Sequence, residues 1–386
     1  MVAKHRHPVE VDVAVVGAGP VGATAAALLA RSGARIALFE ARPAPSADAR
    51  TLALSHASRE LIESIGAWPD GATAIRSIHI SQKGGPGRTL LESDEHGLPA
   101  LGHTLGYAAL ENALWQRLAA LGIALHAGEA CEAIELGEDL ATARFASGRE
   151  ARSHLLVLAD GGMSAARIPG IVFREKDYGQ VALVAAARTD KPHGGRAYER
   201  FTPSGPVALL PVEGGFALVW SMAPQDASAH AALDDAAFLA ALQSHFGDRA
   251  GHFVAAGRRA SFALRLRTVN APIALRTAIV GNAAQALHPI AGQGLNLGLR
   301  DAASLAAIAS GFPPDAWGTS AMLSAYRDAR RRDVSRGVAF TDFLVGAFAD
   351  SRGLPTWLRG AALTALDLLP PARRALAERM IHGASP

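Results

Sequence analysis

Glycines near the N-terminus are spaced to hold the phosphates of a dinucleotide. Residues 17–22 read GAGPVG, and Glu40 ends the next apolar run. In such a loop Gly17 permits a tight turn, Gly19 lets the backbone approach a pyrophosphate, and Gly22 lets a helix pack closely on a strand. Glu40 is placed to accept hydrogen bonds from an adenosine ribose. These residues predict a dinucleotide site and do not distinguish FAD from NAD.

A second group of polar residues follows a short apolar run in the middle of the chain. The run Leu155–Leu158 predicts a buried strand that leads directly into Asp160 and Gly161. Ser164 and Arg167 follow at short spacing. An ordinary Asp-Gly turn with a capping serine explains these residues as well as a second cofactor-binding segment does.

The block Gly281–Asp301 carries the most chemical information in the chain. It reads GNAAQALHPIAGQGLNLGLRD. Pro289, Gly292 and Gly294 would let backbone amides approach a flat ring. A helix that begins at Leu295 would direct its N-terminal amides toward negative charge on that ring. Together with the two earlier motifs, this spacing favours a flavin site over a plain glycine-rich loop.

Short apolar runs are expected to position these motifs. Strands at Val11–Val16 and Ile36–Phe39 with a helix at Ala23–Ser32 predict the opening of a doubly wound fold. Leu110–Ala120 predicts an amphipathic helix, and Ile273–Val280 predicts another buried strand.

The middle of the chain has a different pattern, with alternating runs broken by Pro and Gly. These runs predict an antiparallel sheet, and they are Val181–Ala187, Ala208–Leu210, Phe216–Trp220 and Phe262–Leu266. Phe216 and Trp220 are interpreted as core, with a lipophilic pocket as the alternative. Leu233–Phe246 predicts a helix, and helices are expected from Asp301 onward.

Composition argues against several classes of protein. The chain has 386 residues and a net charge of +3, and its Lys and Arg residues are scattered, so we expect no nucleic-acid partner. The one cysteine, Cys131, excludes an internal disulfide, suits a reducing compartment and is expected to be a small core residue. No metal-binding spacing of His or Cys occurs, so we expect no metal site.

The apolar stretch Val13–Ala30 superficially resembles a signal peptide or a membrane span. Its glycines and Pro20 interrupt it where an apolar helix would be continuous, so we interpret it as strand, turn and helix. We expect a cytoplasmic protein. An apolar face within Leu354–Leu369 either packs against the body or a subunit partner, or lies on a membrane surface.

The motifs together resemble those of class A flavin monooxygenases. Asp160–Arg167 is similar to their D-G-x-x-S-x-x-R motif, and Gly281–Asp301 is similar to G-D-x-x-H-x-x-x-P-x-x-G-Q-G-x-N. More narrowly, the chain resembles the ubiquinone-biosynthesis FAD-dependent hydroxylases. Asn282 and Gln285 replace the usual Asp and His, which is similar to the branch of 2-octaprenyl-6-methoxyphenol hydroxylases. Further similar segments are Arg50–His56, Tyr198–Pro203, Gly205–Pro206, Leu209–Pro211 and Leu369–Arg373.

The resemblance implies an α/β fold of the p-hydroxybenzoate hydroxylase type: a Rossmann-type FAD-binding domain, an inserted antiparallel-sheet substrate domain and C-terminal helices. We expect the FAD-binding domain at residues 8–75, 103–172 and 272–330. The substrate domain is expected at residues 76–102 and 173–271, because the nucleotide-binding segments recur on both sides of it. Residues 331–386 are expected to form the helical region.

The resemblance also implies an activity. NAD(P)H would reduce FAD, O2 would form a C4a-hydroperoxyflavin, and the ring of a polyprenylated phenol would accept one oxygen atom. Peripheral contact with a membrane or a quinone-biosynthesis complex is an expected partner interaction. The alternatives are a hydroxylase of another aromatic substrate, a flavin-dependent halogenase or reductase, and a flavin-binding scaffold. The absence of a W-x-W motif argues against the halogenase.

The resemblance assigns candidate roles to individual residues. His288 and Pro289 are the candidate catalytic positions; His288 could tune the flavin or touch substrate, although a lone histidine is more often structural. Arg50 is expected at the start of a helix after the second strand, in contact with the FAD phosphates. Asn282 can hydrogen-bond a ribityl hydroxyl as a carboxylate does, but without charge. The candidate cofactor-binding residues are Gly17, Gly19, Gly22, Glu40, Arg50, Asp160, Gly161, Gly281, Asn282, Gly292, Gly294, Leu295 and Asn296.

Overall fold

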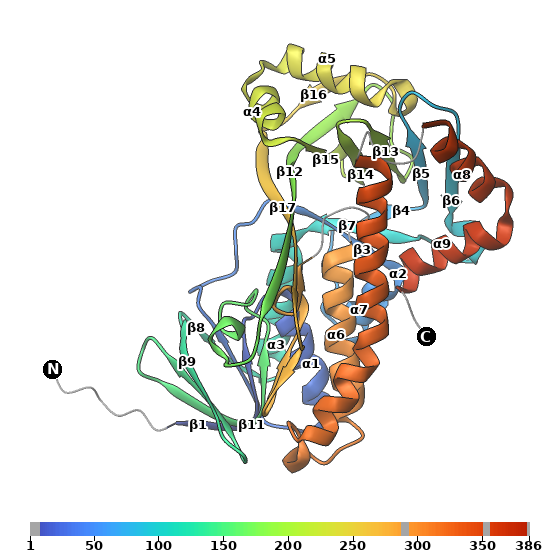
Figure 1. Ribbon diagram of the computed structural model, residues 1–386. Coiled ribbons are helices and arrows are strands. Elements are labelled where there is room, and N and C mark those ends of the chain that lie inside the picture. The colour runs from blue at the N-terminus through green and yellow to red at the C-terminus, as the bar shows by residue number, and fades with distance from the viewer. Residues whose placement is uncertain (1–7, 287–292, 350–355, 384–386) are drawn as a thin grey trace.

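The computed structural model describes residues 8–286, 293–349 and 356–383 (Figure 1). A mixed sheet and its helices form one part of the molecule, and an antiparallel sheet forms the other part, above it in Figure 1. The long helix α7 (Ser320–Ala349) runs beside both parts. This arrangement confirms the predicted fold class.

The mixed sheet carries the three motifs. Its elements and the helices on it are β1 Val9–Val16, β2 Ile36–Glu40, β8 Ala124–Ala127, β9 Cys131–Leu136, β10 Ala141–Phe145, β11 Glu150–Leu158, β18 Ile273–Ala274, β19 Thr277–Ile279, α1 Pro20–Leu29, α3 Tyr107–Ala120 and α6 Gln293–Ala309. The order is β18-β19-β11-β1-β2-β8, parallel from β19 to β8. Helices cover one face and the β9–β10 hairpin covers the other, so β1 and β11 end in fully apolar, buried residues.

The antiparallel sheet follows the order β20-β17-β12-β15-β14-β13-β5-β6, with β16 paired to β12. Its strands are β5 Ser77–Gln82, β6 Arg88–Glu92, β12 Phe173–Thr189, β13 Arg196–Thr202, β14 Gly205–Val212, β15 Gly215–Met222, β16 Phe253–Ala256, β17 Ala260–Val269 and β20 Gln285–Ala286. One pair, β13 with β5, is parallel. Helices α4 (Pro224–Ala232) and α5 (Asp235–Phe246) pack on one face, where Trp220 and Phe238 are buried.

A small sheet joins the two parts of the molecule. Strands β3 (Thr51–Ser55) and β4 (Thr73–Ile75) both pair with β7 (Gly102–Gly106), and α2 (His56–Ser64) follows β3. The small sheet contacts β14 on one side and α6 on the other. It therefore lies between the predicted nucleotide-binding and substrate regions. The exact domain limits stay a prediction, and β20 adds two residues of the third motif to the antiparallel sheet.

The C-terminal helices α8 (Thr356–Leu368) and α9 (Pro370–His382) cover the edge strand β6. The Thr89 hydroxyl donates to the Leu363 carbonyl over 2.9 Å, and the Leu90 amide donates to the Asp367 carboxylate over 3.0 Å. A Cβ added at Gly360 would lie 2.3 Å from the Pro86 carbonyl oxygen, so the helix needs glycine there. The helices thus satisfy polar groups that an open sheet edge would expose.

Two sequence predictions need correction in their local structure. Ile273–Val280 is not one buried strand but a tight hairpin of β18 and β19, because Arg276 at its turn has φ 55°. The helix predicted to begin at Leu233 begins after Asp234, whose carboxylate caps it by accepting from the Ala237 amide.

A buried carboxylate on α6 holds the third motif to the body. One oxygen of Asp301 accepts the Gly281 amide over 2.9 Å and the Gln285 side-chain amide over 2.5 Å. The other oxygen accepts Arg330 Nε of α7 over 2.7 Å. One residue thus ties the end of β19, β20, α6 and α7 together.

Arg330 is the cation of this buried network, and its replacement tests how much the network stabilises the fold. It also pairs with Asp333 over 2.7 Å, and all three charged side chains are at most 5% exposed. Arg330→Met leaves two carboxylates buried without this cation, so we expect the free energy of unfolding to fall by about 3–5 kcal/mol. Urea unfolding of the purified protein measures this change.

The matched control is Arg327→Met, one turn away on the same helix, whose ion pair with Asp328 is exposed. We expect no measurable change in its unfolding midpoint, because exposed ion pairs contribute little. An Arg330→Met variant as stable as the control would contradict the structural role of the network.

Candidate active site

A cavity of about 1740 Å³ extends from the β1–α1 turn to the inner face of the antiparallel sheet. Pockets for one small molecule usually measure about 300–1,000 Å³. The cavity therefore has room for a dinucleotide and a second ligand. The predicted site residues that line it are Gly17, Gly19, Glu40, Arg50, Asp160, Gly161, Asn282, Gly294, Leu295 and Asn296.

The β1–α1 turn faces the cavity, and two of its glycines are required by packing. Gly17 has φ 99°, and a Cβ there would lie 2.7 Å from the carbonyl carbon of Ala159, the residue that follows β11. A Cβ at Gly22 would lie 2.0 Å from the Gly17 carbonyl oxygen. Gly22 therefore stands behind the cavity wall and allows α1 to approach the turn, as the sequence predicts.

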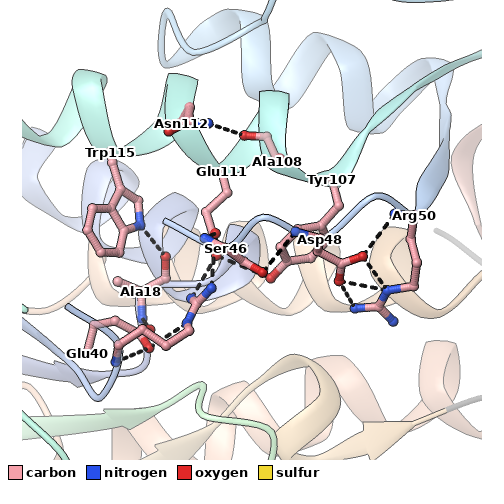
Figure 2. A network of polar contacts seen from close by, with 11 residues as sticks. Ala18, Glu40, Ser46, Asp48, Arg50, Tyr107, Ala108, Glu111, Asn112 and Trp115 are labelled. Carbon is pink, nitrogen blue, oxygen red and sulfur yellow. Dashed lines mark hydrogen bonds and ion pairs between the residues drawn. The ribbon is translucent and has the colours of Figure 1, made fainter. Parts of the chain in front are cut away.

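Glu40 ends β2 beside this turn and is buried (Figure 2). Its carboxylate accepts the Ala18 amide over 2.8 Å, and it accepts the Arg42 amide and Nε over 3.0 and 2.9 Å. Burial alone would raise the pKa of Glu40, but these hydrogen bonds outweigh it and the pKa is lowered. The side chain is a fixed anion at the place where a ribose is expected.

Arg42 and Glu111 extend this network, although they belong to none of the three sequence motifs. Glu111 of α3 is fully buried and holds the Arg42 guanidinium through two hydrogen bonds of 2.8 and 3.0 Å (Figure 2). It also accepts the Ser46 amide. Glu111 lies on the same face of α3 as Leu114 and Leu118, and a charged residue on an apolar helix face could have been recognised from the sequence.

Arg50 lines the cavity, but its predicted local structure is wrong. It precedes strand β3 and not a helix, because the small sheet takes up the chain at this point. Its guanidinium pairs with the Asp48 carboxylate and lies 5.4 Å from the centre of the Tyr107 ring (Figure 2). Burial raises the pKa of Tyr107 to about 12, so the phenol is neutral there. Contact between Arg50 and phosphates stays a prediction.

Asp160 combines the two interpretations of the second motif. Its carboxylate accepts the Gly162 and Ser164 amides over 3.0 and 2.8 Å, which makes it the cap of an Asp-Gly turn. The same residue and Gly161 also line the cavity. The turn is therefore both a local structure and part of the cavity wall.

Arg267 of β17 connects the second motif to the third, and nothing in the sequence pattern marks it. Its guanidinium donates to the Gly161 carbonyl and, over 3.1 Å, to the Asn282 carbonyl. It also lies against the Phe173 ring of β12. One strand of the antiparallel sheet thus fixes two loops of the mixed sheet.

The third motif divides into residues that face the cavity and residues that support them. Asn282 is exposed to the cavity, whereas Gln285 is buried against Asp301. Gly281 also supports the fold, because a Cβ there would lie 3.0 Å from the Val21 side chain. Gly281 lies behind the cavity wall, and its role in cofactor binding stays a prediction.

The start of α6 completes the wall. Gly294, Leu295 and Asn296 of its first turn line the cavity, so the helix N-terminus faces it. The Asn296 side chain accepts the Ser55 amide and donates to the Ala53 carbonyl, which fixes β3. The remaining predicted residues of this motif, His288, Pro289 and Gly292, lie outside the described part of the chain.

Cys131 and Trp220 differ in their relation to the cavity. Cys131 was expected in the core, but it is half-buried at the start of β9 and lines the cavity. Trp220 is core, as predicted, and packs against Phe238 of α5 on the opposite face of the antiparallel sheet.

Comparisons with known proteins agree with this geometry. A family model described as an FAD binding domain matches residues 10–341. Ubiquinone hydroxylase UbiL of Rhodospirillum rubrum is 34% identical over 94% of this chain and 87% of that protein. The 3-demethoxyubiquinol 3-hydroxylase of Escherichia coli is 29% identical over 92% of this chain and 94% of that protein.

Solved structures show the same fold. The p-nitrophenol 4-monooxygenase PnpA of Pseudomonas putida aligns with a TM-score of 0.77 at 18% identity, covering 97% of this chain and 99% of that one. PqsL of Pseudomonas aeruginosa aligns with a TM-score of 0.75 at 21% identity, covering 92% and 100%. Motifs, cavity and relatives agree, and the chain belongs to the ubiquinone-biosynthesis hydroxylase family of FAD-binding flavoprotein monooxygenases.

Proposed function

We propose that the protein hydroxylates the aromatic ring of a polyprenylated phenol in ubiquinone biosynthesis, with FAD, NAD(P)H and O2. FAD, when bound, supplies the transfer of electrons to oxygen and the activation of oxygen. The protein's part is to bind the phenol, orient its ring and exclude water. The relatives named as ubiquinone hydroxylases support the substrate class.

The observation that carries the proposal is the continuity of one cavity across both parts of the molecule. The inner face of β5, β13, β14 and β15, together with α8, forms an apolar chamber at its far end. Side chains that line this chamber include Ile78, Ile80, Leu210, Val219, Leu363 and Leu366. A prenyl chain is a run of apolar isoprene units that gains by leaving water for such a wall.

The backbone and surroundings of Gly19 indicate that the dinucleotide end of the cavity can hold FAD. Unlike Gly17 and Gly22, it has ordinary backbone angles, φ −65° and ψ 177°, that any residue adopts. The nearest protein atom to a Cβ there would be the Tyr107 hydroxyl at 3.5 Å. Protein packing therefore does not require glycine at this position, while the close approach of a pyrophosphate does. Gly19, Glu40 and the N-terminus of α1 would hold the adenosine diphosphate part.

Contact with a lipid surface is part of the proposal, because a prenylated phenol partitions into membranes. No helix in the described part of the chain is long and apolar enough to cross a bilayer. However, α8 lines the apolar chamber with Leu363 and Leu366 and exposes Trp357 and Leu368 at its ends, which are 68% and 72% accessible. Such a helix can lie in the interface with its apolar residues inserted.

The reaction is tested in strains that each lack one ubiquinone-ring hydroxylase. Expression of this protein should restore ubiquinone in the strain whose missing hydroxylation it performs, and mass spectrometry of the intermediate that accumulates in that strain identifies the ring carbon. If the gene restores no hydroxylation at any ring position, the proposed function is wrong.

Gly19→Leu tests FAD binding without disturbing the fold. We expect FAD affinity to fall by at least about 100-fold, or roughly 2.7 kcal/mol, because the side chain occupies the pyrophosphate path. Flavin fluorescence titration of the apoprotein measures the dissociation constant. Gly106→Leu is the matched control: Gly106 also caps a helix, with φ −71°, and a Cβ there meets no atom within 4 Å.

The control should bind FAD like the parent protein, and both variants should keep the parent's melting temperature as apoproteins. Equal FAD affinity in the two variants would contradict the site. In the deletion strain, rescue by a Gly19→Leu variant that has lost FAD would favour the scaffold alternative over catalysis.

Trp357→Ser combined with Leu368→Ser tests the lipid contact. We expect the fraction that sediments with phosphatidylglycerol-containing vesicles to fall about fivefold, because two interfacial apolar anchors are lost. Val254→Ser is the control; Val254 lies on β16, a strand that contacts α5 and lies away from α8 (Figure 1), and is 49% exposed in the parent. Sedimentation of the double variant at the parent's level would exclude α8 as the lipid-binding element.

A further inference from the structure

One carboxyl group interrupts the apolar chamber. Strand β13 alternates between the two faces of the sheet. Tyr198 packs against Phe246 of α5 and Arg200 donates to the Ser81 hydroxyl, while Ala197, Glu199 and Phe201 line the cavity. Among the described cavity-lining residues of β5, β13, β14 and β15, Glu199 is the only charged one.

The surroundings of Glu199 supply no counter-charge. Its neighbours in register are Ile80 on β5 and Ala208 on β14. The described residues give its carboxylate neither a hydrogen bond nor an ion pair, and it is half-buried because one side is open to the cavity. An unpaired carboxyl group in an apolar wall costs stability, so a ligand that hydrogen-bonds to it would gain by doing so.

Other charged groups face the same space from neighbouring elements. They are Glu175 and Arg265 on β12 and β17, Arg258 before β17, and Arg359 on α8. Asp342 of α7, the helix that packs on β13, is paired with Lys176. None of these described groups bonds to Glu199, so its protonation depends mainly on burial and on what occupies the chamber.

We propose that Glu199 is a catalytic residue: its carboxylate accepts a hydrogen bond from the phenolic hydroxyl of the substrate and then takes the proton of that hydroxyl. This inference rests on the proposed function, since it assigns the polar end of the same substrate. The prenyl chain would lie along the apolar side chains, while the one carboxylate fixes where the hydroxyl sits and hence which way the ring faces.

The proton transfer balances within the pair. The phenolic O–H bond breaks, a new O–H bond forms on a Glu199 carboxylate oxygen, and the electron pair stays on the phenolic oxygen, where the ring delocalises it. Burial raises the pKa of Glu199 from 4.5 to about 7. A carboxylate of this basicity is a far better proton acceptor at neutral pH than an exposed glutamate.

Glu199 also carries a stability cost, which a purely structural residue would not. Its folded-state pKa is raised, so the folded protein loses stability as pH rises from about 4.5 to about 7. Glu199→Gln removes the charge at almost constant shape. It should therefore raise the melting temperature of the apoprotein at about pH 8 more than at about pH 5.

Calorimetric titration of the FAD-loaded protein with 2-prenylphenol tests the inference. If the phenol binds the ionised carboxyl, about half a proton leaves per phenol bound near pH 7, and affinity rises about tenfold from pH 6 to pH 8. Protons are counted from the binding heats in buffers of different ionisation enthalpy. The methyl ether of the same phenol has no hydroxyl to donate and should release no proton.

Two variants separate Glu199 from other carboxyl groups. Glu199→Gln should abolish proton release and the pH dependence while FAD affinity stays within about twofold of the parent. Glu175→Gln, which removes another carboxyl group from the cavity wall, should behave like the parent. Proton release that persists in Glu199→Gln would overturn the inference, as would equal proton counts for the phenol and its methyl ether on the parent protein.

These results are independent of whether the protein hydroxylates the probe. Glu199-dependent proton release without a hydroxylated product, under NAD(P)H and O2, would support the phenol site and count against the proposed reaction. Hydroxylation without Glu199-dependent proton release would support the reaction and overturn the role of Glu199.

Discussion

The Asp301 carboxylate accepts the Gly281 amide and the Gln285 side chain with one oxygen, and the Arg330 guanidinium with the other. These bonds join four elements at one buried group: the end of β19, the edge strand β20, and the helices α6 and α7. They hold α6 against β19, and the first turn of α6 faces the cavity. A buried group that does not line the cavity thus helps to position the cavity's flavin end.

The two parts of the molecule contribute different chemistry to one continuous space. The mixed sheet brings glycine turns, helix N-termini and the fixed Glu40 anion, all suited to a dinucleotide. The antiparallel sheet brings an apolar wall interrupted by Glu199. Arg267 bonds across the boundary to Gly161 and Asn282, so the loops at the flavin end are held from the substrate side.

The sequence predicts the parts of the site that local patterns encode. Parallel strands bring their carboxyl ends to one edge, and this rule alone unites the motifs after β1, β11 and β19. Long-range pairing lies beyond such patterns. Neither the strand that follows Arg50 nor the position of Cys131 in the cavity wall follows from neighbouring residues. The cavity-facing position of Glu199 follows from strand register, where a shift of one residue would turn it to the other face.

We propose that one cavity presents a prenylated phenol to oxygen activated at FAD. The most direct measurement mixes the FAD-loaded protein with NAD(P)H, 2-prenylphenol and isotopically labelled O2, and follows the phenol by mass spectrometry. We predict a product that carries one labelled oxygen atom on the ring, formed only when FAD, phenol and reductant are all present. Consumption of NAD(P)H that yields hydrogen peroxide and unlabelled phenol alone, with both the probe and longer prenylated phenols, would contradict the account.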